Sequence, residues 1–64
     1  MAKYKLSDSQ KTAYWAEIIV ANLKSYLSQE MSAEDFLKLY PHADIDILNK
    51  AVAKLITEDK IKQV

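Results

Sequence analysis

Apolar side chains recur every three or four residues in three stretches of the chain, and this spacing predicts three helices. The first and longest is expected over residues 8–29. Ser7 followed three positions later by Gln10 is typical of a capping box, and Asp8 places a negative charge at the positive end of the helix dipole. This helix is the clearest element of the pattern.

The first predicted helix has two apolar sides. A broad stripe is expected to face the core. Its members are Trp15, Ala16, Ile19, Val20, Leu23, Tyr26 and Leu27. A narrower strip of Tyr14, Ile18 and Ala21 lies off this stripe. Either an N-terminal strand covers the narrower strip or the strip contacts a partner, because exposed aromatic residues are enriched at interfaces.

The second predicted helix is short and covers residues 33–40. Ser32 is the expected N-cap, and Glu34 and Asp35 follow it near the positive end of the dipole. Pro41 disfavours helical backbone at the residue before it, so it ends the helix.

The third predicted helix covers residues 45–57 and begins after Asp44, another good N-cap. One face is apolar and is expected to pack on the core: Ile45, Leu48, Ala51, Val52, Leu55 and Ile56. The opposite face is expected to remain open to solvent: Asp46, Asn49, Lys50, Ala53, Lys54 and Thr57.

The two ends of the chain alternate between apolar and polar residues and predict short strands at residues 3–6 and 60–63. We expect these strands to pair as a two-stranded ribbon with Leu6 and Ile61 facing the core. Packing against the first helix must hold the ribbon, because isolated two-stranded ribbons are weak. The expected fold is therefore mainly α, a three-helix bundle with a small terminal ribbon, in one domain of 64 residues.

The amino-acid composition argues against several classes of function. The absence of Cys excludes disulfides and thiolate chemistry and fits a cytoplasmic location. No apolar run approaches the length of a membrane span, so no membrane partner is expected. The formal net charge is zero, but the two ends are basic, residues 30–46 are acidic, and every positive charge is a Lys. Arg makes the commonest bidentate contact to guanine, so its absence weakens base readout.

The order short helix, turn, longer helix and expected strand over residues 32–64 resembles the second half of a winged helix-turn-helix domain. Residues 48–64, LNKAVAKLITEDKIKQV, are similar to the recognition helix and following strand of that family. The resemblance implies a winged-helix-like bundle, without a full wing, that binds DNA or protein. The chain departs from the family by placing Asp44 and Asp46 at the start of the presumed recognition helix, where a positive dipole end normally favours phosphate.

The sequence contains no strong signal for a metal site or for catalysis. His42 with Asp44 and Asp46 makes a weak metal-ligand set, and we expect no metal and no cofactor. No nucleophile has a recognisable base partner. Without Gly there is no phosphate-cradling loop. We therefore expect a protein that is not an enzyme.

Three interpretations of the function remain. The first is a small DNA-binding regulator or accessory factor, assisted by dimer formation, that contacts duplex DNA through the third helix. Its contact residues are expected to be Asn49, Lys50, Lys54, Thr57, Lys60 and Lys62. The alternative is a protein-interaction module, an inhibitor or adaptor, that uses the acidic segment 30–46 or the strip of Tyr14, Ile18 and Ala21. A self-associating helical protein is a third interpretation.

Overall fold

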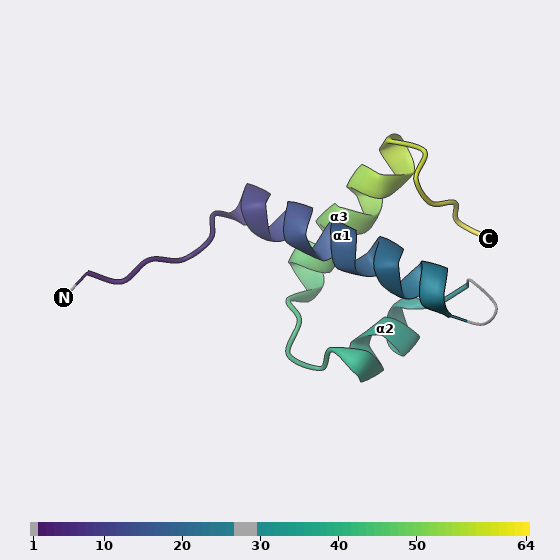
Figure 1. Ribbon diagram of the computed structural model, residues 1–64, viewed down its shortest axis with the longest axis horizontal. Coiled ribbons are helices and arrows are strands. Elements are labelled where there is room, and N and C mark those ends of the chain that lie inside the picture. Colours follow the sequence, from purple (N-terminus) through teal and green to yellow (C-terminus); the bar gives the residue numbers. More distant parts are fainter. Residues whose placement is uncertain (1, 27–29) are drawn as a thin grey trace.

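The computed structural model describes residues 2–26 and 30–64, which form three helices (Figure 1). Helix α1 spans Asp8–Ser25, α2 spans Ala33–Leu39 and α3 spans Ile45–Thr57. Helices α1 and α3 cross and pack against each other, and the short α2 lies beside them. The predicted mainly α fold with three packed helices is confirmed.

The predicted terminal ribbon is wrong. Neither residues 3–6 nor residues 60–63 form a strand, and the described residues contain no strand at all. The two ends of the chain lie at opposite sides of the helices in Figure 1 and cannot pair. Leu6 is exposed, whereas Ile61 packs against the core on its own. Ile61 is partly buried without pairing to another strand. A two-stranded ribbon is only marginally stable by itself, so strand pairing would add little to this contact.

Helix α1 begins as the sequence predicts but ends earlier. Ser7 is its N-cap and accepts a hydrogen bond from the backbone N–H of Gln10 at 3.3 Å. The helix ends at Ser25, because Tyr26 has extended backbone angles (φ −74°, ψ 140°). The Ser25 hydroxyl donates to the carbonyl of Asn22, a local bond that competes with helical hydrogen bonding. The remainder of the predicted helix, residues 27–29, lies outside the described residues.

Helix α2 is held at its start by a full capping box. The Ser32 hydroxyl accepts from the Asp35 backbone N–H at 3.1 Å, and the Asp35 carboxylate accepts from the Ser32 backbone N–H at 3.2 Å. Two backbone donors that a helix start leaves unpaired are thereby satisfied. The helix ends at Leu39, and Pro41 follows one residue beyond its C-cap. Strong capping suits a helix that is too short to be stable by itself.

Helix α3 is capped at both ends. One Asp44 carboxylate oxygen accepts from the backbone N–H groups of Asp46 (2.9 Å) and Ile47 (3.4 Å). At the other end, the N–H of Lys60 donates to the carbonyl of Leu55 at 2.9 Å, and Asp59 adopts a left-handed φ of 58°. This is the geometry of a Schellman C-cap, in which glycine usually holds the left-handed position.

The core lies where α1 and α3 cross. Its buried members are Ala16, Ile19, Phe36, Leu48, Ala51 and Leu55. Ala16 and Ala51 are small, and Ala51 is 0% exposed, which lets the two helices approach closely. Helix α2 contributes Phe36 alone to this buried set. The ring of Trp15 meets Phe36 edge-on at 6.1 Å between centroids and Tyr40 at 5.5 Å, and these aromatic contacts attach α2 to α1.

Three residues that the sequence predicted in the core are exposed instead. In α3, Ile47 is 4% exposed and buried, whereas Ile45 is 56% exposed, so the buried face is rotated from the predicted one. Ile56, also predicted in the core, is 42% exposed. Tyr26 was expected in the core and is exposed, because the helix that would have carried it inward ends one residue before it.

Candidate binding surfaces

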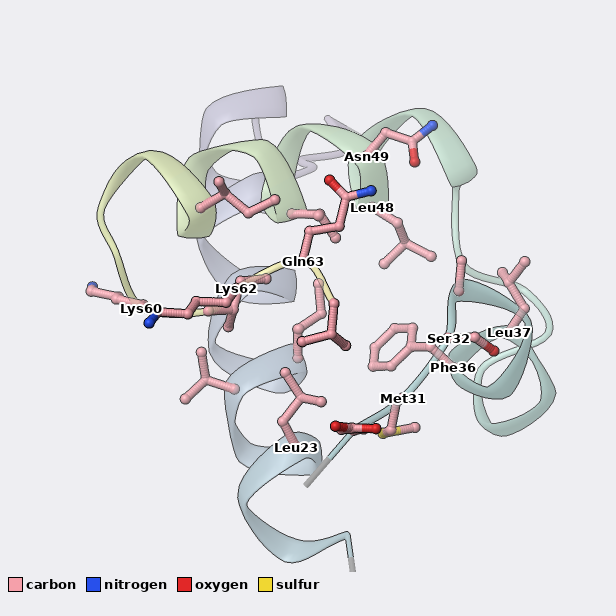
Figure 2. A pocket seen from close by; sticks show the side chains of 18 of the residues that line it. Leu23, Met31, Ser32, Phe36, Leu37, Leu48, Asn49, Lys60, Lys62 and Gln63 are labelled. Atoms are coloured by element: carbon pink, nitrogen blue, oxygen red, sulfur yellow. The ribbon is translucent and has the colours of Figure 1, made fainter. Parts of the chain in front are cut away.

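An open groove with a volume of about 920 Å³ lies between the second half of α1, the start of α2, one side of α3 and the C-terminal segment. The apolar side chains that line it include Ile19, Leu23, Met31, Phe36, Leu37, Ile45, Leu48, Val52, Ile56 and Ile61. Leu23, Phe36 and Leu48 surround the same space although they come from three different helices (Figure 2). The groove is therefore a feature of the assembled bundle rather than of one helix.

The groove is open because α3 carries more apolar surface than its neighbours cover. The rotation that buries Ile47 leaves Ile45 and Ile56 at the groove, each more than two-fifths exposed. Helix α2 has only seven residues and cannot extend along the whole of α3. A contiguous apolar surface that neighbouring helices leave open is a candidate interaction site.

The charged residues that line the groove are mostly basic. They are Lys24 from the last turn of α1, Lys60 and Lys62 from the C-terminal segment, and Glu30. Figure 2 shows Lys60 and Lys62 on one side of the groove, with Ser32 and Leu37 across from them. Lys60 forms a surface ion pair with Glu58, 3.2 Å between nitrogen and oxygen. Within the described part of the chain, Lys24 and Lys62 have no ion-pair partner.

Four of the six predicted DNA-contacting residues line two hollows that have Lys60 in common. Asn49, Lys60 and Lys62 line the groove. Lys54 lines a second hollow together with Lys60, Glu17 and Glu58. Lys50 and Thr57 line neither hollow. All six side chains are exposed, so Lys50 and Lys54 are open to solvent as expected.

The N-terminus of α3 is a poor phosphate site. Two of its free N–H groups, those of Asp46 and Ile47, already donate to the Asp44 carboxylate. Helix N-termini bind phosphate through such N–H groups and the positive end of the dipole. A carboxylate held there satisfies the donors and opposes a second anion.

The strip of Tyr14, Ile18 and Ala21, predicted as an alternative protein-binding surface, is exposed only in part. Tyr14 is 54% exposed and meets Trp15 edge-on at 5.6 Å, and Ala21 is exposed. Ile18 instead packs against the core and is only partly exposed. No strand covers Tyr14, so one of the two explanations for this strip is removed. The acidic segment 30–46 runs through α2 and its connections, and Asp35 and Asp44 serve there as helix-capping residues.

The described residues include no group of three His, Cys, Asp or Glu side chains that could hold a metal ion. His42 is exposed in the turn between α2 and α3. Over the same residues, no helix combines the length and the apolar character needed to cross a membrane.

Comparison of the chain with protein-family models, with curated proteins and with solved structures finds no match. Function must therefore be argued from the surfaces themselves.

The groove was missed by sequence reasoning, although a signal for it exists. Ile45, Val52 and Ile56 are spaced by seven and four residues, which places them in one line along α3. Added to the buried Ile47, Leu48, Ala51 and Leu55, this line makes the apolar surface of α3 wider than a single helix contact requires.

Proposed function

We propose that this chain is a non-enzymatic, cytoplasmic protein-binding module whose groove takes an amphipathic helix of another protein. The observation that carries the proposal is the open apolar groove, edged by the exposed side chains of Ile45 and Ile56. Neutral overall charge and the absence of Arg fit a protein partner better than a polyanion.

A helix is the favoured form of the bound segment. Extended peptides bind by adding a strand to an exposed sheet edge, and the described residues offer no sheet. A groove between helices instead binds the apolar face of an amphipathic helix. The contacting side chains of that helix are three, four and seven residues apart.

The helix is expected to come from a different protein rather than from a second copy of this chain. The apolar faces of α1 and α3 meet in the core, and α2 directs Phe36 into it. None of these helices could enter the groove of another copy without leaving its own core.

The test is a selection from displayed random peptides of about sixteen residues, long enough for four helical turns. We expect enrichment of peptides with large apolar residues at helical spacing. Binding should be lost in an Ile45→Asp/Ile56→Asp variant, which places two charges at the groove. Leu39→Asp is the matched control, because Leu39 is an equally exposed apolar residue that does not line the groove.

Far-ultraviolet circular dichroism verifies that each variant keeps its helices. If no peptide is enriched, or if the double variant binds the selected peptides as well as Leu39→Asp does, the proposal is refuted. Loss of binding in a Tyr14→Asp variant alone would assign the contact to the narrow strip of α1 instead.

DNA binding is the second candidate, favoured by the exposed Lys50 and Lys54, one turn apart on α3. The order helix, turn, helix fits the winged-helix resemblance, although the residues after α3 form no strand. Lysine contacts to phosphate give salt-dependent affinity. Fluorescence anisotropy with a labelled duplex at low salt should then show binding that falls with salt and is weakened in Lys50→Glu/Lys54→Glu. Unchanged anisotropy at the lowest salt would exclude this candidate.

A further inference from the structure

We infer that the helix bound in the groove carries acidic residues along one side, the side that lies against Lys24 and Lys62. The inference rests on the proposed function and adds the chemical character of the partner. It follows from how charge is distributed around an otherwise apolar groove.

The positive charge at the groove comes from two separate parts of the chain. Lys24 lies in the last turn of α1, and Lys62 lies in the segment that follows α3. Both line the groove, and both side chains are exposed. Lys60 contributes less, because Glu58 lies 3.2 Å from its ammonium group and partly neutralises it. Lys24 and Lys60 line both the groove and the second hollow, so they lie where the two adjoin, and Figure 2 shows Lys62 beside Lys60. The lysines of α1 and of the C-terminal segment thus place positive charge along one side of the groove, where the flank of a bound helix would lie.

The other side of the groove lacks this charge. There the polar lining residues are Ser32, at the start of α2, and Asn49, on α3, and neither is ionised. Glu30 is the one acidic residue among the described residues that line the groove. A helix with apolar residues facing the groove and carboxylates on one flank would therefore meet complementary charge in one orientation and not in the reverse orientation. The asymmetry predicts both the sign of the partner's charge and the direction in which it binds.

Rim charges of this kind act mainly on specificity and on the rate of association. Each exposed lysine–carboxylate contact is modest, so two of them together should change affinity by roughly tenfold at low salt. The difference should shrink as salt rises, because exposed charges are screened.

The experiment uses a groove-binding peptide from the selection and a twin in which every acidic residue is replaced by Lys. Fluorescence anisotropy measures the affinity of both for the wild-type chain. The acidic peptide should bind roughly tenfold more tightly than its basic twin. In a Lys24→Glu/Lys62→Glu variant the order should reverse. Lys50→Glu/Lys54→Glu is the matched control, with the same change in net charge on residues that do not line the groove, and it should keep the wild-type order.

The outcomes separate the two proposals. If selected peptides bind but carry no excess of acidic residues, or if the reversed variant keeps the wild-type preference, the acidic character of the partner is refuted while the groove remains a binding site. If neither twin binds, the proposed function itself fails. Concentration-dependent dimerisation in sedimentation that is lost in Ile45→Asp/Ile56→Asp would place a second copy in the groove and would overturn the inference as well.

Discussion

The rotation of α3 leads to the sharpest prediction about stability. Ile45 and Ile47 are the same residue type in the same helix, yet Ile47 is 4% exposed and Ile45 is 56% exposed. Truncation of each to Ala removes the same atoms. Because only Ile47 is buried, we expect the two variants to differ strongly in their free energy of unfolding.

The magnitudes follow from burial. Truncating a buried Ile to Ala typically costs about 2–5 kcal/mol, from lost transfer energy and from the cavity that remains. For Ile45, more than half of whose surface stays in water, the loss should be about 1 kcal/mol or less. The higher helix propensity of Ala offsets a few tenths of a kcal/mol in each variant. A chain of this length has a total stability of roughly 3–10 kcal/mol, so Ile47→Ala should remove a large share of it.

Urea denaturation provides the measurement. Trp15 is the single Trp of the chain and packs against Phe36 and Tyr40, so its fluorescence reports on the junction of α1 and α2. Circular dichroism reports on all three helices, and agreement between the two probes verifies a two-state transition. A loss in Ile45→Ala equal to or larger than that in Ile47→Ala would refute the assignment of the buried face.

Substitutions at three further positions test the helix ends and one tertiary hydrogen bond, each by urea denaturation against the wild-type chain. Asp44→Ala removes the acceptor that caps α3 and should lower the free energy of unfolding by about 1 kcal/mol, whereas Asp44→Asn should preserve most of it. An unchanged transition midpoint in Asp44→Ala would contradict the cap. Asp59→Gly should raise the free energy of unfolding by about 0.5–1 kcal/mol, because Gly adopts the left-handed φ of 58° without steric cost, and Asp59→Val should lower it; the opposite order would reject the Schellman geometry. Tyr40→Phe removes the hydroxyl that accepts from the Asn22 side chain at 3.1 Å and should cost about 0.5–1.5 kcal/mol; no loss would mean that this bond does not stabilise the attachment of α2.

Local sequence signals predicted the helices well. Ser7, Ser32 and Asp44 act as N-caps in the structure, and Pro41 follows the end of α2 as expected. Such signals are local, because a cap depends on hydrogen bonds within about four residues. The end of α1 was less predictable, since no glycine or proline marks it and the apolar pattern continues past Ser25.

Tertiary features were harder to predict. Periodicity alone assigned Ile45 to the core-facing side of the third helix and omitted Ile47. Their burial depends on the angle at which α3 crosses α1, and small residues such as Ala16 and Ala51 set how closely the helices meet. The alternation at the chain ends suggested strands, but tertiary contacts decide whether such segments pair.

The candidate site was predicted only in part. Solvent exposure of Lys50 and Lys54 follows from the periodicity of α3, and the structure agrees. Lys60 lines a hollow together with Lys54, and the joint role of these lysines with Lys62 in DNA binding stays a prediction. The wide apolar face of α3 was the one sequence signal for the groove, and it could not show the shape of the groove, since the lining comes from three helices and the C-terminal segment.

The most direct test of the groove as the binding surface is an NMR titration of the ¹⁵N-labelled chain with a selected amphipathic peptide, followed through backbone amide shifts. The account predicts the largest shift changes at Leu23, Phe36, Val52 and Ile56, which line the groove on three helices. Shift changes confined to Lys50 and Thr57, or to the side of α1 that carries Tyr14, would contradict it.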